Sequence, residues 1–396
     1  MLDPMSMGIS KIAWLSPFPP QKSGIANYSL WLIRALHPHI EIDLFYDKTP
    51  PASDIADEFD VYPISMFPER RTNYHERVYH LGNHRDFHKN IYQLAWDFPG
   101  TIVLHDYYLN AFLHDAFYRQ TNGHLYELAL ADSGNQPTPS GIHSLLPKLG
   151  RNISSIPMSH AIVNRSNKAV VHHRWVKNQF PNSQHVEVIP HFAGINHMPT
   201  TDELAGFKQR FGIKENDFLI SCLGFINKNK LPRLQIEVTK RLVAEGYPVR
   251  LLFAGEIAPD VRHLQSEVES GPNSEDITFT GYLAEADYFS AVFTSDVVVN
   301  LRNPSMGEAS GTLMHALAAG RPTIISDVNQ YKEFPDSVCW KLPHDENEAD
   351  LLYHYITALL SNKKLRAAMS SNSLSYVDTV FALERIVPHW LRVLSK

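Results

Sequence analysis

The sequence predicts an α/β protein made of two doubly wound domains in tandem, each built on a parallel sheet. Short runs of Val, Ile and Leu alternate with longer stretches of helical periodicity, and this series occurs twice along the 396 residues. Continuous apolar runs are typical of strands buried on both faces of a parallel sheet, and their alternation with helices indicates right-handed crossover units. A chain of this length accommodates two domains of about 100–200 residues each.

Each domain is expected to contain six strands. In the first domain they are residues 11–16, 41–46, 77–81, 101–105, 168–172 and 186–189. In the second they are residues 218–224, 249–255, 277–280, 296–300, 322–326 and a run around Val338. Helices are expected to begin at Gly24, capped by Ser23, and at Pro232, whereas Pro388 is expected to break the final helix.

The domain boundary is expected around Pro190, in a segment that carries two prolines and one glycine between a strand and the next helix. This predicts an N-terminal domain of residues 1–193 and a C-terminal domain of residues 194–379. The turn-rich stretch Asp132–Ser155 predicts a long loop, and loops of this length often act as lids over functional sites.

Composition excludes several classes of protein. Lys and Arg number 36 against 42 Asp and Glu, for a formal net charge of -6, so nucleic acid is not an expected partner. No apolar run reaches the ~20 residues of a membrane span, and the N-terminus does not resemble a secretion signal. We therefore expect a cytoplasmic protein without a transmembrane segment, in which Cys222 and Cys339 are buried, reduced thiols.

Polar residues follow two predicted strands of the N-terminal domain, at the end where parallel sheets bind ligands. Ser23 and Gly24 open a helix whose N–H groups could meet a phosphate, although such a turn can also serve packing alone. His105 and Asp106 come at the end of another strand. His105 could orient a sugar hydroxyl, or it could be a loop histidine bonded only to backbone.

His80, His84 and His88 are spaced by four residues. On a helix this spacing can hold zinc, but Gly82 and Asn83 interrupt the helix between the first two, and the acidic pattern that supports zinc-binding histidines is missing. A metal site is therefore not expected, and Asn83 and His88 are expected to line a cleft.

Residues 223–231 of the C-terminal domain connect a strand to a helix. Lys228 and Lys230, with Asn227 and Asn229, could clamp a diphosphate there. A solvated surface turn is the alternative, because basic residues also suit such turns.

Residues 300–326 are the strongest candidate for a site. A strand ends at Asn300, and a short helix follows a loop that carries Arg302, Gly307, Glu308, Ser310 and Gly311. Glycines at a helix start allow a phosphate to reach free N–H groups, and Glu308 could hold sugar hydroxyls. A role in helix capping alone would explain Glu308 but not Arg302 or the paired glycines.

The stretch PSMGEASGTLMHALAAGRPTIISDV, residues 304–328, resembles the donor-binding signature of family-4 retaining glycosyltransferases of GT-B fold. The likeness extends along nearly the whole chain and is next most specific in residues 279–299. It implies two Rossmann-like domains that face a central cleft, the N-terminal one for the acceptor and the C-terminal one for the nucleotide-sugar donor. It also implies that the final helix, residues 380–396, crosses back onto the N-terminal domain.

The resemblance, together with the residue patterns described above, assigns roles to individual residues. His105, Glu308 and Lys230 would be catalytic: the first two contact or face the transferred sugar, and Lys230 holds the diphosphate. The donor would be bound by Gly24, Asn227, Lys228, Tyr282, Arg302, Ser310, Gly311 and Thr312, with Tyr282 near the nucleobase. The acceptor side of the cleft would include Ser23, Asn83, His88 and Asp106. Such enzymes need no metal or other cofactor, and the sequence contains no Asp-x-Asp triplet.

The sequence departs from the family pattern in three places. The second glutamate of the signature, which binds the donor ribose, is replaced by His315 or Ala316, depending on the end from which the spacing is counted. Phe225 replaces the arginine beside the clamp lysine, so that Lys228 would compensate. The loop GEASG is one residue shorter than usual. These changes resemble a polysaccharide-assembly branch of the family.

The expected function is the transfer of a sugar from a nucleotide diphosphate sugar to a glycan or lipid-linked acceptor in cell-surface polysaccharide synthesis. Two alternatives remain open: an isomerase like the nucleotide-sugar 2-epimerases, which needs no acceptor, and a catalytically silent nucleotide-sugar or glycan binder. A lipid-linked acceptor would suit peripheral contact with the cytoplasmic face of a membrane. Basic and aromatic residues that could contribute are Arg70, Arg71, Tyr74, Arg119 and Lys148.

Overall fold

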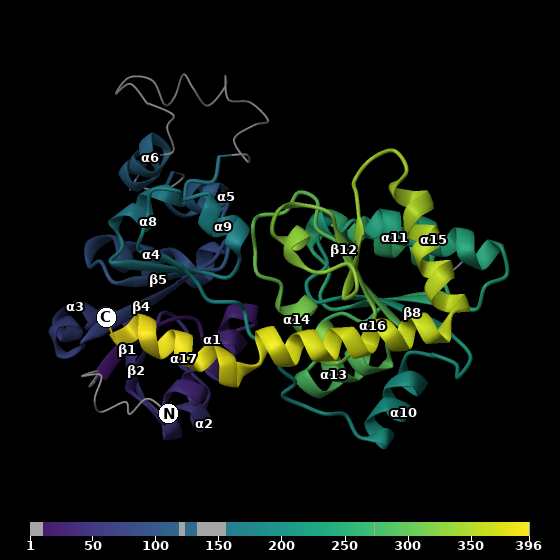
Figure 1. The fold of residues 1–396 in the computed structure, drawn as a ribbon, viewed down its shortest axis with the longest axis horizontal. Coiled ribbons are helices and arrows are strands. Elements are labelled where there is room, and N and C mark those ends of the chain that lie inside the picture. Colours follow the sequence, from purple (N-terminus) through teal and green to yellow (C-terminus); the bar gives the residue numbers. More distant parts are fainter. Residues whose placement is uncertain (1–10, 119–122, 133–155, 273, 396) are drawn as a thin grey trace. The chain divides into compact units, whose positions relative to one another are not determined.

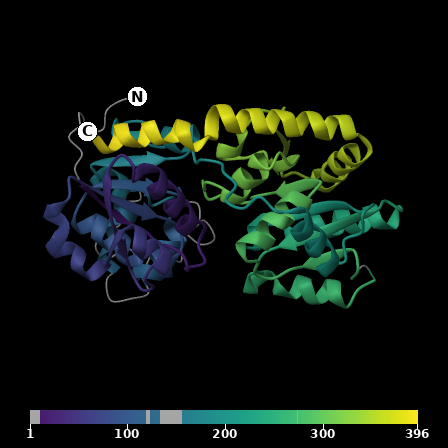
Figure 2. The same ribbon diagram turned by 90° about the horizontal axis from the view of Figure 1, so that it is seen from below.

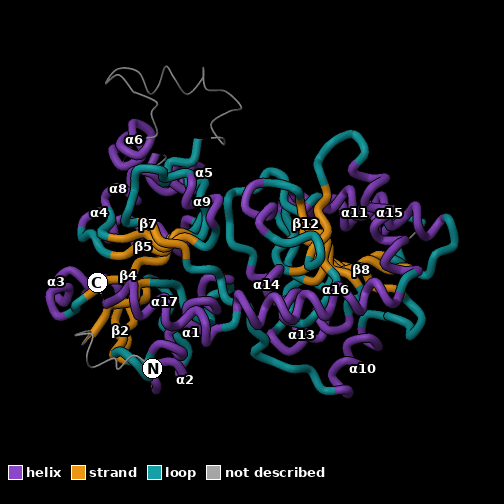
Figure 3. The backbone as a smooth tube through the Cα atoms, in the orientation of Figure 1, coloured by secondary structure: helices purple, strands orange, loops and turns teal. Residues whose placement is uncertain are grey.

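The computed structural model describes residues 11–118, 123–132, 156–272 and 274–395, which form two compact units. The first unit takes in the described residues of Met1–Pro190, together with Met306–Ala309 and Leu383–Lys396. The second comprises His191–Ser305 and Ser310–Ala382. Each unit contains one parallel sheet with helices on both faces (Figures 1, 2 and 3). The predicted fold class is confirmed. The predicted loop Asp132–Ser155 lies outside the described residues, except for Asp132.

The sheet of the first unit has seven strands in the order β3-β2-β1-β4-β5-β6-β7, and all neighbouring strands run parallel. The six predicted strands are confirmed to within one residue at each end. The sequence did not predict β3, because its four residues include a proline and lie at the sheet edge. The strands are β1 (Lys11–Leu15), β2 (Glu41–Tyr46), β3 (Asp60–Pro63), β4 (Glu76–Leu81), β5 (Thr101–Leu104), β6 (Lys168–Val171) and β7 (Val186–Val188).

The helix that follows β1 begins where the sequence predicts. It starts at Gly24, and Ser23 Oγ accepts a hydrogen bond from the Ile25 N–H at 3.3 Å. The helices of this unit are α1 (Gly24–Leu36), α2 (Ser53–Glu58), α3 (Phe67–Arg70), α4 (Arg85–Asp97), α5 (Asn110–Leu113), α6 (Gly123–Asp132), α8 (His160–Arg165), α9 (Arg174–Asn178) and α17 (Leu383–Ser395).

Helix α17 belongs to the first unit although it ends the chain, and it packs on α1. Its Trp390 ring lies 5.7 Å from the ring of Trp14 on β1, and the Lys168 ammonium donates to the Val393 carbonyl. The prediction that Pro388 breaks this helix is wrong, because α17 continues through it. The buried apolar face of α17 compensates for the one backbone hydrogen bond that a proline removes.

The sheet of the second unit has six parallel strands in the order β10-β9-β8-β11-β12-β13. All six predicted strands are confirmed. Cys222 on β8 and Cys339 on β13 are buried, free thiols, as the apolar runs around them predict. The strands are β8 (Phe218–Leu223), β9 (Val249–Ala254), β10 (Ile277–Phe279), β11 (Val297–Asn300), β12 (Thr323–Ser326) and β13 (Cys339–Leu342).

Several helices of the second unit pack against one another: α11 with α15, α10 with α13, and α16 with both α14 and α15. Pro232 is the first residue of α11, as predicted. Within the described ranges, every helix is too short or too polar to cross a membrane. The helices are α10 (Thr201–Arg210), α11 (Pro232–Ala244), α12 (Arg262–Glu269), α13 (Glu285–Thr294), α14 (Gly311–Ala318), α15 (Glu348–Ser361) and α16 (Lys363–Tyr376).

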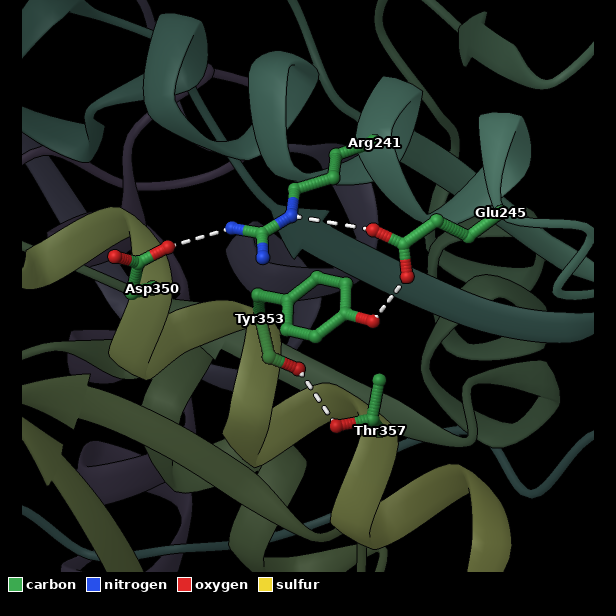
Figure 4. A network of polar contacts seen from close by, with 5 residues as sticks. All are labelled: Arg241, Glu245, Asp350, Tyr353 and Thr357. Carbon is green, nitrogen blue, oxygen red and sulfur yellow. Dashed lines mark hydrogen bonds and ion pairs between the residues drawn. The ribbon is translucent and has the colours of Figure 1, made fainter.

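A polar network joins α11 and α15 at the surface (Figure 4). The Arg241 guanidinium pairs with Glu245 at 3.3 Å and with Asp350 at 2.6 Å, and it lies 4.1 Å from the centre of the Tyr353 ring. The Tyr353 hydroxyl donates to Glu245, and the Thr357 hydroxyl donates to the Tyr353 carbonyl at 3.1 Å. Exposed pairs of this kind contribute about 0–1 kcal/mol each, so the network adds little to the stability of the second unit.

Candidate functional site

The polar residues that follow β1, β4 and β5 lie at the carboxyl edge of the first sheet, because parallel strands all end on the same side. Asn83 and Asp106, which follow β4 and β5, are in contact: the Asn83 N–H donates to Asp106 Oδ2 at 2.9 Å. The Phe112 N–H donates to Asn83 Oδ1 at 3.1 Å. Asn83 and Asp106 therefore form hydrogen bonds that hold the loops at this edge. Ser23, a third predicted site residue, caps α1.

His105 lies at the end of β5 and only 5% of its surface is exposed. Its Nε2 lies 2.9 Å from Nδ1 of His80 on β4, so that one ring donates a hydrogen bond to the other. The rings of Tyr28 on α1 and His172 after β6 each lie 5.0 Å from the His105 ring. Sequence analysis did not name these three neighbours for the site. Position was the available signal, because His80 and His172 lie at the ends of strands.

Burial keeps the histidines around His105 uncharged at neutral pH. Loss of hydration lowers the pKa of His172 to about 4 and that of His80 well below its ordinary value. His88, which was expected to line a cleft, is buried in α4, and burial lowers its pKa to about 4. Its Nδ1–H donates to the His80 carbonyl at 3.0 Å. The rings are therefore held by packing and neutral hydrogen bonds.

The segment Met306–Ala309 belongs to the first unit, although its neighbours in sequence belong to the second. The N–H groups of Tyr107 and Tyr108 both donate to the Met306 carbonyl, at 2.9 and 3.0 Å, and the Ala309 N–H donates to the His105 carbonyl at 3.1 Å. Glu308 Oε2 accepts a hydrogen bond from the Met306 N–H at 2.6 Å. These hydrogen bonds join the loop after β5, which begins with His105, to the segment that contains Glu308. Both residues are predicted to be catalytic.

Lys230 lies in the second unit, at the end of the 3₁₀ turn Lys228–Lys230 before α11, and it is buried. Its ammonium donates to the Leu223 carbonyl at the end of β8, and its own carbonyl accepts from Gln235 Nε2 at 2.8 Å. Burial, followed by the positive charge of Arg302, lowers the pKa of Lys230 to about 7. Lys228 is exposed instead. The two predicted clamp lysines thus lie in different electrostatic surroundings.

The N-terminus of α14 carries a hydroxyl-rich cap. Ser310 is the N-cap, and its Oγ accepts a hydrogen bond from the Leu313 N–H at 3.3 Å. Thr312 Oγ1 donates to Asn300 Oδ1 at 3.1 Å and lies 3.2 Å from Ser310 Oγ. A Cβ added to Gly311 would meet no atom within 4 Å, so there is open space beside the first turn. Helix N-termini of this kind attract anions through their N–H groups.

Gly224 lies between Lys230 and the N-terminus of α14, and it allows the two to come close together. Its φ is +79°, and a Cβ there would lie 2.7 Å from Thr312 Cγ2 and 3.4 Å from Lys230 Nζ. Only glycine combines this backbone conformation with so little space. The structure therefore brings Lys230, Ser310, Gly311 and Thr312 together at the carboxyl edge of the second sheet.

The other predicted donor residues of the second unit differ in exposure and in their hydrogen bonds. Tyr282 is 56% exposed, and Phe225, which replaces the expected arginine, is 53% exposed. The Arg302 N–H donates to Ser326 Oγ at 2.7 Å. Asn227 precedes the 3₁₀ turn, and its Oδ1 is buried without a hydrogen-bond partner among the described residues.

His315, which replaces an expected glutamate, points to α13. Its Nδ1 lies 2.9 Å from the Tyr288 hydroxyl, and burial lowers its pKa to about 4. Ala316, the other candidate for that position, is buried in the core of the second unit. His315 is therefore a neutral residue with one ring nitrogen engaged by Tyr288.

One acidic set among the described residues is close enough to hold a metal: Glu41, Asp43 and Asp60. Lys11 lies among these carboxylates, with its ammonium 2.6 Å from Glu41 and 2.9 Å from Asp43. The four residues lie at or near the starts of β1, β2 and β3, at the edge of the sheet opposite to His105. The lysine supplies the positive charge that these carboxylates require.

The residues suggested for membrane contact do not form an exposed group in the described part of the chain. Tyr74 is buried, and the guanidinium groups of Arg70 and Arg71 lie over aromatic rings of the first unit. Arg119 and Lys148 lie outside the described residues.

Residues 206–375 match the family model described as glycosyl transferases group 1. This part of the chain is therefore similar to that family. The match covers the strand, turn and helix that contain Lys230, and the loop and helix that contain Glu308 and Ser310. No protein of curated function matches the chain in sequence.

Solved glycosyltransferase structures share the fold of the whole chain, which is GT-B. HepE (Alr3699) from Anabaena, solved with UDP and glucose, has a TM-score of 0.65 at 14% identity, covering 97% of this chain and 99% of HepE. Sucrose-phosphate synthase from Thermosynechococcus elongatus gives 0.66 at 16%, covering 97% and 98%. WaaG, a glycosyltransferase involved in lipopolysaccharide biosynthesis, gives 0.59 at 14%, covering 97% and 99%.

Acid should destabilise the protein through its buried histidines. A histidine whose pKa is lowered on folding binds fewer protons in the folded than in the unfolded state, so the stabilisation is complete above about pH 6.5 and is lost as the pH falls towards 4. Urea unfolding at several pH values measures this slope. His172→Gln should flatten it, whereas His263→Gln, on the exposed side of α12, should leave it unchanged. Equal slopes in all three proteins would contradict the neutral cluster.

Proposed function

We propose that this protein transfers a sugar from a nucleotide diphosphate sugar to a glycan or lipid-linked acceptor, with retention of anomeric configuration. The observation that carries the proposal is the open space at the N-terminus of α14, beside the buried ammonium of Lys230. Backbone N–H groups, the Ser310 and Thr312 hydroxyls and an ammonium together form a binding site for a diphosphate.

Two glycines support this proposal because packing does not require them. Gly311 and Gly24 are the first residues of α14 and α1, neither has a positive φ, and a Cβ on either would meet no atom within 4 Å. Gly307, by contrast, has a φ of +66° and would place a Cβ 2.5 Å from Tyr107 Cβ. The missing side chains of Gly311 and Gly24 leave room for a ligand to approach backbone N–H groups.

The similar proteins support the donor class and the biological setting. HepE is solved with UDP, with UDP and glucose, and with UDP-glucose, and WaaG is involved in lipopolysaccharide biosynthesis. We therefore assign this protein a nucleotide-sugar donor and a part in cell-surface polysaccharide synthesis. The proposed acceptor class is a glycan or a lipid-linked saccharide.

The proposed reaction takes place on one face of the sugar. The bond between the anomeric carbon and the phosphate oxygen breaks, and its electron pair goes to the diphosphate. The acceptor hydroxyl oxygen bonds to the same face of that carbon, and its proton passes to the leaving phosphate oxygen. Lys230, Lys228 and the N–H groups of α14 stabilise the charge that develops on the diphosphate. No separate general base is required.

The remaining candidates position the substrates in this proposal. His105 and Glu308 orient the transferred sugar, and Tyr282 lies towards the nucleobase. Further donor contacts come from Asn227 and Arg302. The residues Ser23, Asn83, His88 and Asp106 shape the acceptor side, mainly through the loops and the helix that they hold in place.

The transfer itself can be tested by incubating the protein with nucleotide diphosphate sugars, with and without saccharide acceptors. We expect a glycosylated acceptor and one equivalent of nucleoside diphosphate, with the donor's anomeric configuration kept in the product by NMR. EDTA should not change the rate. Conversion of the donor without an acceptor would instead indicate an isomerase, and binding without turnover would indicate a silent binder.

Gly311→Ala should weaken nucleoside diphosphate binding about tenfold or more while leaving the fold intact, because the new methyl group fills the proposed phosphate space and touches no protein atom. Calorimetric titration measures the affinity, and thermal unfolding measures the stability. Gly206→Ala, the same change in the open surroundings of α10, is the matched control and should bind normally. An unchanged affinity in Gly311→Ala would show that the diphosphate does not bind at the N-terminus of α14.

Affinity for the diphosphate should also fall as the pH rises above about 7. Because burial lowers the pKa of Lys230 to about 7, its positive charge is lost in this range, at a cost of up to about tenfold in affinity per pH unit. Titrations between pH 6 and 9 measure the effect. Lys230→Ala should bind weakly at every pH and lose the dependence, whereas the exposed Lys228→Ala should keep it. A pH dependence that survives in Lys230→Ala would exclude Lys230 as its source.

A further inference from the structure

A hollow of about 440 Å³ lies beside the edge strand β7 of the first unit. It is lined by Arg174, Lys177 and Asn178 of α9, Glu187 and Val188 of β7, and Arg392 of α17. Its volume falls within the range of small-molecule pockets, about 300–1,000 Å³. The residues belong to three segments of the chain that only the fold brings together.

The charge of this hollow is opposite to that of the chain as a whole. Its lining has three cationic side chains and one carboxylate, a net of +2, whereas the chain carries a formal net charge of -6. Arg174, Lys177 and Arg392 are all exposed. All the polar side chains of the lining except Glu187 can donate hydrogen bonds, as the recognition of an anion requires.

Internal pairing accounts for only part of this charge. Arg392 lies 3.6 Å from Glu187, which is longer than a hydrogen bond, and no described residue forms an ion pair with Lys177. Charged residues on an edge strand can prevent pairing with other chains, which would explain Glu187 but not cations on two neighbouring helices. Lys177 also lies in the last turn of α9, but that helix has only five residues and a correspondingly small dipole effect.

We propose that this hollow is a binding site for a phosphate-bearing ligand, separate from the diphosphate site of the second unit. Guanidinium and ammonium groups that line an open hollow are suited to phosphate oxygens. The volume exceeds that of a single phosphate and leaves room for the group attached to it. A phosphorylated saccharide in solution and an anionic lipid headgroup share this chemistry, and the proposal does not depend on sugar transfer.

The test measures binding of inorganic pyrophosphate by calorimetry, and of phosphatidylcholine vesicles with or without phosphatidylglycerol by sedimentation. All proteins carry Lys230→Ala, so that the diphosphate site of the second unit contributes little. Adding Lys177→Gln should weaken binding about tenfold, since a hydrogen bond to a charged group contributes about as much as a tenfold change in affinity. The matched control Lys364→Gln changes an exposed lysine of α16 and should have no effect.

The two arms identify the source of the ligand. Binding of both pyrophosphate and anionic vesicles, each weakened by Lys177→Gln, supports a general phosphate site. Binding of pyrophosphate alone supports a phosphorylated saccharide in solution, and binding of vesicles alone supports a lipid headgroup. Arg392→Gln, in the hollow but on another helix, should weaken the same interaction. Binding that is absent, or equal in Lys177→Gln, Arg392→Gln and Lys364→Gln, would overturn the proposal.

Discussion

The parallel direction of every strand is the constraint on which the rest of this structure depends. In each sheet all strands end at the same edge, so residues far apart in sequence come out side by side. In the first unit this geometry gathers Ser23, Asn83 and His105. In the second it places Lys230, after β8, next to the α14 terminus, after β11, because β8 and β11 are neighbouring strands. A strand that ran antiparallel to the others would place its loop at the opposite edge.

Burial then decides how the polar residues at these edges behave. His80, His88 and His172 lose their water and stay neutral, so they can support His105 through ring contacts and hydrogen bonds. Lys230 is also dehydrated, and its burial lowers the pKa of its ammonium group to about 7. The cations around the hollow at β7 remain exposed and keep their hydration. The polar residues at these edges are thus buried and neutral or nearly so, whereas the cations at β7 are exposed.

Backbone hydrogen bonds make the segment Met306–Ala309 part of the first unit, although its neighbours in sequence belong to the second. It lies between β11 and α14 of the second unit, yet its carbonyl and N–H groups pair with Tyr107, Tyr108 and the His105 carbonyl of the first. Glu308 is therefore tied to the loop after β5 rather than only to its neighbours in sequence. Gly307 permits this arrangement, since a side chain there would collide with Tyr107.

The sequence by itself determined the fold class, twelve of the thirteen strands in the described residues, the start of α1 and α11, and the burial of both cysteines. These features follow from local patterns: apolar runs, a capping serine and a proline at a helix start. Tertiary structure alone decided that α17 runs through Pro388, that Tyr28, His80 and His172 lie around His105, and that three cations line a hollow at β7. Each of these depends on contacts between segments distant in sequence, where burial and neighbouring charge outweigh local propensity.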